Sequence, residues 1–201
     1  MRKPLLAASV AVLLALPAAA ATSEAYYAPP PPAVDSGEFF AGFGFGGFTS
    51  DHASLTNTGF AWVFRGGVNF YRYFGAELNY QGTSTFQNEF VNGVQFGGTS
   101  FTEQQITADL KLGYPFRVGY RNILRPYGFA GVGFAAITSA TTTTPFGPLN
   151  EGAAAFPVGA GLSYNVTPAF VVDARYTYNF LTESIANTWN VLFNLGVNIG
   201  G

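Results

Sequence analysis

Apolar and polar residues alternate along most of the chain with a period of two. The alternation is clearest over residues 170–180, where one parity is apolar and the other is mostly small, polar or charged. The first set is Phe170, Val172, Ala174, Tyr176, Tyr178 and Phe180, and the second is Val171, Asp173, Arg175, Thr177 and Asn179. Because successive side chains of a strand point to opposite faces, such a segment predicts a β-strand with two different surroundings. This pattern is typical of a transmembrane β-barrel.

The same alternation divides the chain after residue 37 into eight candidate strands. We expect them at residues 39–48, 60–70, 74–81, 102–114, 126–137, 154–165, 170–180 and 189–199. The segment 126–137 is rich in Gly and Ala on both parities, so its faces stay unassigned. No Asp, Glu, Lys or Arg falls on the apolar face of the other strands, where a midplane Arg or Lys would cost about 2–4 kcal/mol. The expected fold is all-β, an eight-stranded antiparallel up-and-down transmembrane barrel with a filled polar lumen.

Composition supports this expectation by elimination. Charged residues make up 10% of the chain, against about 25% in soluble domains. No run after residue 21 reaches the roughly 20 apolar residues of a membrane-spanning helix, which leaves a closed barrel as the structure that satisfies its backbone within lipid. Cysteine is absent, which excludes disulfides and thiolate metal sites. We expect no cofactor and no metal site.

The N-terminus has the pattern of an export signal. Arg2 and Lys3 precede an apolar stretch at residues 5–16, and small residues follow at 18–21. We expect a signal peptide at 1–21 with cleavage after Ala20 or Ala21, a proline-rich periplasmic linker at 22–37, and the barrel at 38–201. Cleavage would leave 9 − 2 = 7 basic residues against 11 acidic ones, which argues against nucleic acid as a partner.

The expected connections alternate in length. The longer ones are 49–59, 82–101, 138–153 and 181–188, and the shorter ones are 71–73, 115–125 and 166–169. Small outer-membrane barrels have short periplasmic turns and long extracellular loops, so both chain ends should be periplasmic.

Charged residues on the inward parity are predicted to meet at one level of the lumen. They are Arg65, Glu77, Asp109, Lys111, Asp173 and Arg175. Three cations and three acids leave that layer neutral, as buried charges require. An eight-stranded barrel is just wide enough for side chains to fill, so we interpret the layer as a plug. The alternative is a small ion or solute channel, because ionisable groups within membranes are often functional.

Outward aromatic residues near the strand ends are predicted to lie at the two lipid interfaces, as in the aromatic girdles of outer-membrane barrels. They are Trp62, Tyr80, Tyr114, Tyr164, Tyr178 and Trp189.

Four segments resemble the small eight-stranded outer-membrane β-barrel family, which includes the OmpA transmembrane domain, OmpX and opacity-type surface proteins. They are 39–47 (FFAGFGFGG), 74–80 (FGAELNY), 125–133 (RPYGFAGVG) and 189–197 (WNVLFNLGV). The resemblance implies a monomeric, non-catalytic protein of the outer membrane of a diderm bacterium. It also implies contact with membrane lipid and lipopolysaccharide, insertion by the barrel assembly machinery, and loops that contact partners outside.

The connection at 82–101 is the candidate interaction surface for a host or surface ligand. Its apolar residues Phe86, Phe90, Val94 and Phe96 stand among polar neighbours. Alternatively, these residues extend two strands as a hairpin around Asn92-Gly93, which is a strong turn signal. Both interpretations are compatible, because a protruding strand edge can template a partner strand.

One pattern raises an enzymatic hypothesis. His52 and Ser54 resemble the His-x-Ser of outer-membrane lipid A deacylases, in which a histidine base activates the serine. No acid follows at a suitable spacing, and Asp51 would face away in an extended chain. We therefore expect no catalysis, with a deacylase-like activity as the less favoured alternative.

Overall fold

The computed structural model describes residues 36–49, 58–70, 73–91, 94–118, 122–141, 150–182 and 187–199. All of them belong to one compact unit, Ala33–Gly201. The expected signal peptide and most of the expected linker lie outside the described residues. Across the described ranges, no helix is long and apolar enough to cross a membrane.

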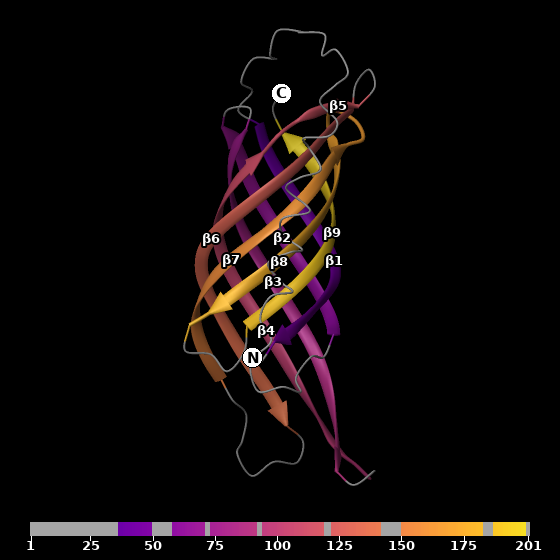
Figure 1. The fold of residues 1–201 in the computed structure, drawn as a ribbon, viewed down its shortest axis with the longest axis vertical. Helices are drawn as coiled ribbons and strands as arrows, with labels where there is room; N and C mark the ends of the chain where they lie inside the picture. Colours follow the sequence, from indigo (N-terminus) through magenta and orange to yellow (C-terminus); the bar gives the residue numbers. More distant parts are fainter. Residues whose placement is uncertain are drawn as a thin grey trace, which may run out of the picture. The chain divides into compact units, whose positions relative to one another are not determined.

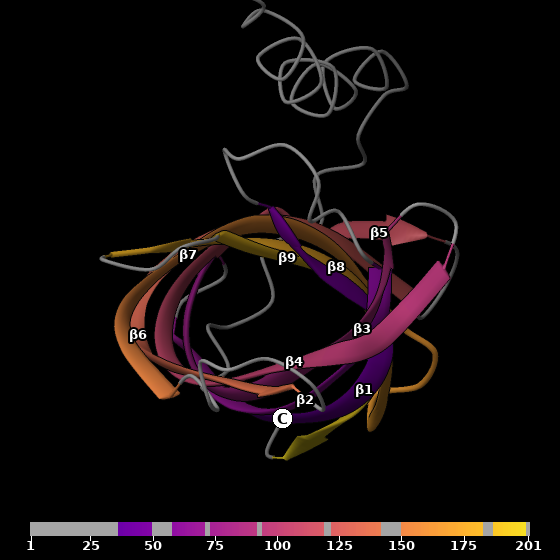
Figure 2. The same cartoon turned by 90° about the horizontal axis from the view of Figure 1, so that it is seen from below.

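The described residues form nine strands in one antiparallel sheet. They are β1 (Ser36–Thr49), β2 (Thr58–Phe70), β3 (Phe74–Val91), β4 (Val94–Gly113), β5 (Phe116–Val118), β6 (Asn122–Thr141), β7 (Asn150–Asn165), β8 (Phe170–Leu181) and β9 (Asn187–Ile199). The hydrogen-bonded order is β4-β3-β2-β1-β9-β8-β7-β6-β5, and an additional β4–β6 pairing closes the sheet. Figures 1 and 2 show the resulting barrel from the side and along its axis. Eight strands therefore form the wall, which confirms the predicted fold class.

The remaining strand, β5, has only three residues and is not part of the eight-stranded wall. It pairs with β6 through Phe116↔Leu124 and Val118↔Asn122. The expectation of a plain short connection at 115–125 is therefore wrong. Alternating Phe116, Arg117 and Val118 lengthen the β4–β6 ladder into a small hairpin past the rim.

The expected long connection at 82–101 is also wrong, because most of it is strand. The β3–β4 ladder continues to Val91↔Val94, with an irregularity between Asn88 and Glu89. In Figure 1 this hairpin extends beyond the neighbouring strands. The physical reason is the hairpin alternative: β-forming residues flank Asn92-Gly93, which lies outside the described residues and favours a two-residue turn.

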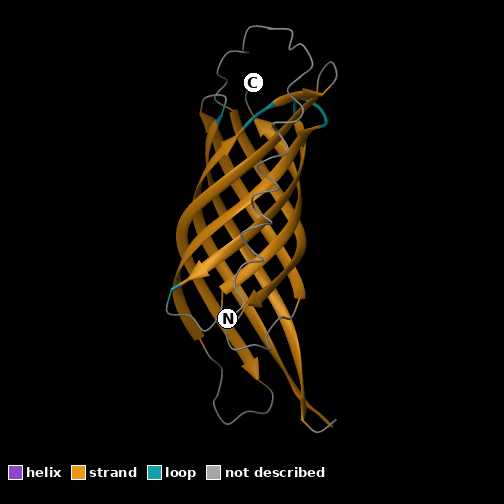
Figure 3. Cartoon of the chain, viewed as in Figure 1, coloured by secondary structure: helices purple, strands orange, loops and turns teal. Residues whose placement is uncertain are grey.

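The two faces of the wall are an apolar outside and a largely polar inside. On β4, Leu110 is 67% exposed whereas its neighbour Asp109 is 3% exposed. The structure also assigns β6, whose faces the sequence left open: Tyr127 and Phe129 are buried inside, and Phe134 is exposed outside. Figure 3 shows how strands account for nearly all of the described chain. Apolar side chains are exposed and polar ones are buried, which is the reverse of a soluble protein and is what burial in lipid requires.

The first and last strands begin and end at the same rim. Gly37 on β1 pairs with Ile199 on β9. Two connections lie at this rim as well. They are the short turn at 166–169, which joins β7 to β8, and the β5–β6 hairpin, which follows the end of β4. We refer to it as the inner rim and to the opposite end, from which the β3–β4 hairpin extends, as the outer rim.

Candidate functional site

The six charged residues predicted for the lumen are brought together in one network. They come from four strands: Arg65 from β2, Glu77 from β3, Asp109 and Lys111 from β4, and Asp173 and Arg175 from β8. Glu77 is central, because its Oε2 lies 2.6 Å from Arg175 Nη1 and its Oε1 lies 2.8 Å from Lys111 Nζ. Arg65 links this group to β8, with its Nη2 2.6 Å from Asp173 Oδ1 and its Nη1 3.7 Å from Glu77 Oε2.

Several of these ion pairs cross the lumen. Around the closed wall, β3 and β8 stand four strands apart, so the Glu77–Arg175 pair joins diametrically opposite sides. Arg175 also donates from Nη2 to Asp109 Oδ2 on β4. Their side chains are no more than 4% exposed. Because an eight-stranded interior is only about as wide as the side chains that fill it, this layer occupies the cross-section of the barrel.

Two further charged residues join the network, and the sequence analysis did not include them. Glu38 on β1 accepts from Lys111 Nζ at 2.8 Å, and its other oxygen lies 3.6 Å from Arg125 Nη1 on β6. Arg125 was placed in a connection and Glu38 ahead of the first strand. Glu38 shares the parity of Gly42, Gly44 and Gly46 in the first strand, which was the signal that could have found it. The unassigned faces of residues 126–137 left Arg125 without such a signal. Four cations now face four acids, so the network stays neutral.

Inward aromatic rings stack on the cations. The Arg175 guanidinium lies 3.4 Å from the centroid of the Phe129 ring, and that of Arg65 lies 4.1 Å from the Phe40 centroid. Tyr127 donates its hydroxyl hydrogen to Asp173 Oδ2 at 2.6 Å and accepts from Arg65 Nη1 at 3.2 Å. Such contacts stabilise a buried guanidinium because they replace the water that would otherwise surround it.

A second, mostly uncharged layer lies on the outer side of the ion pairs. Gln105 Nε2 donates to Asn179 Oδ1 at 3.0 Å, and Asn179 Nδ2 donates to Thr188 Oγ1 at 2.9 Å. Thr188 in turn donates to Glu103 Oε1 at 3.0 Å. Glu103 is 1% exposed and has no cation within ion-pair distance among the described residues. Because Glu103 on β4 and Thr188 on β9 belong to opposite strands, this layer also spans the lumen.

All six aromatic residues predicted for the lipid interfaces lie on outward positions, in two groups. Tyr114 and Tyr164 lie toward the inner rim, and Trp62, Tyr80, Tyr178 and Trp189 lie toward the outer rim. In the outer group, the Trp62 and Tyr80 rings are 5.0 Å apart in an edge-on arrangement, and Tyr178 pairs directly with Trp189. These positions fit aromatic girdles at the two interfaces.

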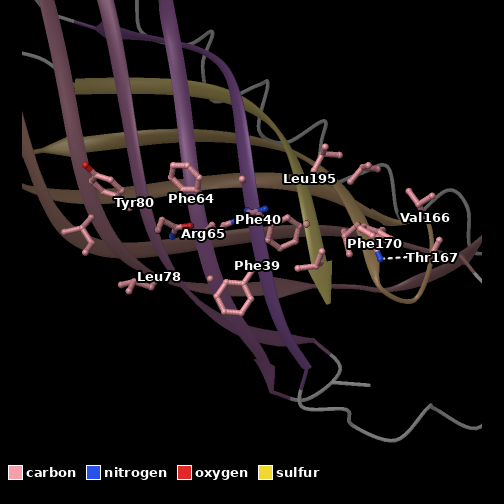
Figure 4. Close-up of a pocket in the computed structure, with 18 residues that line it drawn as sticks. Phe39, Phe40, Phe64, Arg65, Leu78, Tyr80, Val166, Thr167, Phe170 and Leu195 are labelled. Carbon is pink, nitrogen blue, oxygen red and sulfur yellow. Dashed lines mark hydrogen bonds between the residues drawn. The ribbon is translucent and has the colours of Figure 1, made fainter. Parts of the chain in front are cut away.

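The outer surface also carries an open apolar groove, shown in Figure 4. The exposed side chains Phe39, Phe64, Leu78, Phe170 and Leu195 line it, together with the turn at 166–167. These residues occupy the outward parity of their strands. The groove is therefore part of the lipid-facing surface and not an opening into the lumen.

Two groups of predicted site residues are not characterised by the structure. The side chains of Phe86, Phe90, Val94 and Phe96 lie outside the described part of the chain, although their backbone is in β3 and β4. His52 and Ser54 lie wholly outside the described residues. Among the residues that the structure describes, no group of three or more His, Cys, Asp or Glu side chains could hold a metal ion.

The outer face is apolar, the interior carries ion pairs with no net charge, and the sheet closes on itself. These features define a small outer-membrane β-barrel protein. The chain belongs to the family described as the outer membrane protein beta-barrel domain, whose model matches residues 7–199. No curated protein sequence matches it.

Solved structures show the same fold at low sequence identity. Ail of Yersinia pestis, in complex with the heparin analogue sucrose octasulfate, is 20% identical with a TM-score of 0.54, covering 82% of this chain and 99% of Ail. Neisserial surface protein A is 17% identical with a TM-score of 0.61, covering 80% and 96%. OprG of Pseudomonas aeruginosa is 10% identical with a TM-score of 0.52, covering 84% and 99%. These identities carry the fold and not a shared activity.

Proposed function

We propose that this protein is a plugged, non-catalytic barrel that acts in envelope structure or surface interaction, and not by passing solutes through its lumen. The observation that supports the proposal is direct side-chain contact between opposite walls, at Glu77–Arg175 and again at Glu103–Thr188. A pore would need a continuous path for water past both layers. Paired, hydrogen-bonded charges instead hold the interior closed.

Conductance across planar lipid bilayers tests the plug. Purified, refolded protein should give no large, steady channels, whereas a general-diffusion porin added to the same bilayer serves as the positive control. Steady openings from the wild-type protein would refute the plug and favour the alternative, a small ion or solute channel. Folding of the sample is verified by heat-modifiable migration on gels, so silence cannot come from misfolded protein.

The β3–β4 hairpin is the proposed interaction surface. Among the described strands, β2 pairs with β3 only as far as Phe60↔Ser84, so β3 continues to Val91 without that neighbour. An exposed strand edge offers its backbone groups to an extended partner segment. Residues 82–101 contain Glu89 but no Lys or Arg. An uncharged, extended segment of a surface protein therefore fits this hairpin better than a polyanion such as the heparin analogue bound to Ail.

Cell adhesion measures this interaction. Cells expressing a variant with Phe86, Phe90, Val94 and Phe96 all changed to Ser should adhere to host-cell monolayers less than wild-type cells do. The matched control changes the outward pair Ser84 and Thr102 to Ala, which leaves the apolar residues intact. Unchanged adhesion in the first variant, at equal surface amounts, would refute a role for the hairpin. Soluble heparin as competitor distinguishes a polyanion-dependent contact.

The lipid A deacylase alternative is tested separately. Lipid A from cells expressing Ser54→Ala should have the same acyl pattern as lipid A from wild-type cells. A wild-type pattern that lacks one acyl chain present in the variant would establish catalysis.

The remaining proposals concern assembly in the membrane. The protein is proposed to be a monomer in contact with lipid and lipopolysaccharide, inserted by the barrel assembly machinery after cleavage of the signal peptide at Ala20 or Ala21. Intact-mass measurement of the purified membrane protein would detect the signal if it were retained.

A further inference from the structure

The lumen becomes apolar toward the outer rim. Inward side chains there form one buried cluster, with Phe101 packed against it: Phe48, Ala135, Ile137, Ala153, Ala155 and Leu181. The six residues of the cluster are at most 9% exposed, and Phe101 is partly buried. We call these seven residues the apolar cap. Ion pairs and amides predominate elsewhere in the lumen, where the apolar cluster of Ala61, Val63 and Leu192 is smaller. The larger apolar cluster near one rim therefore needs its own explanation.

The cap lies directly beyond the second polar layer. Ile137 pairs with Glu103, and Phe48 pairs with Thr188, so both cap residues adjoin that layer. Leu181 follows Asn179 by two positions on the same face of β8. From the inner rim outward, the lumen therefore holds an ionic layer, an amide and hydroxyl layer, and the apolar cap.

Cap residues come from strands on both sides of the lumen. Phe48 is the penultimate residue of β1, and its ring centroid lies 5.8 Å from that of Phe101 on β4. The same cluster includes Ile137 on β6, the strand opposite β1 in the closed wall. On the β6–β7 side the small residues Ala135 and Ala155 are fully buried, which leaves room for larger side chains from across the lumen. The contacts therefore bridge the barrel and do not merely coat one side.

We propose that the apolar cap is a second, independent permeability barrier, which seals the outer mouth even when the ionic layer is broken. The inference rests on the proposed plugged function and adds to it. Narrow apolar constrictions exclude water, and an ion that enters one loses its hydration without gaining a ligand. The cap contains no ionisable side chain. Salt that weakens ion pairs therefore leaves this barrier unchanged.

Conductance of a set of matched variants tests the cap. The polar-layer variant, Glu77→Ala, Arg175→Ala, Glu103→Ala and Asn179→Ala, breaks the Glu77–Arg175 pair and the three hydrogen bonds of the second layer, and it keeps the ionic network neutral. The cap variant, Phe48→Ser with Phe101→Ser, opens and wets the cap. Each variant alone should stay nearly silent, and the combined variant with all six changes should conduct at least tenfold more than either. The control, Phe43→Ala with Phe193→Ala, removes two rings that pair on the lipid-facing side and should not conduct.

The outcomes separate this inference from the proposed function. Conduction by the wild type would refute the plug itself. Conduction by the polar-layer variant equal to that of the combined variant would overturn the cap alone, and so would a folded combined variant that stays silent. Only samples with heat-modifiable migration are scored.

Thiol labelling gives a second measurement that does not need the combined variant to fold. The chain contains no cysteine, so Thr188→Cys, at a position that is 0% exposed, places one thiol just below the cap. A membrane-impermeant methanethiosulfonate reagent added outside should modify it at least tenfold faster when Phe48 is changed to Ser. Equal labelling rates with and without Phe48 would overturn the cap as a barrier.

Discussion

Arg175 is the residue whose replacement should reveal how the ionic layer contributes to stability. Its guanidinium pairs with Glu77 at 2.6 Å and with Asp109, and it stacks 3.4 Å from the Phe129 centroid. In Arg175→Met, Glu77 keeps Lys111 at 2.8 Å, but Asp109 keeps no cation among the described residues. Removing one partner of a buried ion pair costs about 3–5 kcal/mol, because the remaining charge is left buried and unpaired.

The charge-matched double variant separates this penalty from the loss of contacts. Asp109→Asn alone should cost about 1–2 kcal/mol, because Arg175 still pairs with Glu77. Adding Asp109→Asn to Arg175→Met leaves three cations and three acids, so the pair should be destabilised by only about 2–3 kcal/mol. The coupling, obtained as the difference between the summed single losses and the double loss, should therefore be about 1–5 kcal/mol.

Urea unfolding of the barrel in phospholipid vesicles measures all four proteins, with equal m-values as the condition for comparing midpoints. The refuting result is additivity: if the double variant loses the sum of the two single losses, the unpaired carboxylate does not account for the cost of Arg175→Met. Heat-modifiable migration verifies that each variant is inserted before unfolding begins.

Three further predictions use the same unfolding assay. In Gly161→Ala the new Cβ would collide with the Tyr127 ring and disturb its bonds to Arg65 and Asp173, costing about 1–3 kcal/mol; Gly128→Ala, whose nearest neighbour would be 3.8 Å away, should be tolerated, and equal effects would contradict the reasoning. Leu110→Arg on the lipid-facing side should cost about 2–4 kcal/mol and Val118→Arg at the rim about 0–1; the opposite order would refute the membrane position. Glu103→Gln should be as stable as wild type or up to about 1 kcal/mol more stable, because an amide keeps the Thr188 bond without burying an unpaired charge; a clear loss would show that the carboxylate is needed.

The alternation of apolar and polar residues predicted the wall of the barrel better than it predicted the ends of the strands. Alternation over residues 170–180 was sufficient to predict β8 and both of its faces, because lipid and lumen impose opposite demands on successive side chains. At residues 82–101 the same alternation continued past the membrane, where no lipid marks a limit. Strand length there depends on hairpin pairing, and the expected loop was wrong.

In the lumen, too, the pattern predicted some residues and missed others. Parity alone pointed Arg65, Glu77 and Arg175 inward, and counting along strands placed them near one level. Parity could not assign β6, because Gly and Ala occupy both of its faces, and so Arg125 and the rings of Tyr127 and Phe129 were missed.

The sequence by itself determined that the chain forms membrane strands with a polar interior, because this follows from a local, period-two code that each segment carries independently. Only the tertiary structure decided which charges pair, that Glu38 and Arg125 complete the network, and that apolar side chains gather in the lumen near the outer rim. Those outcomes depend on strand register and closure, which place residues such as Glu77 and Arg175, 98 positions apart, on opposite sides of one lumen. No local pattern encodes that distance.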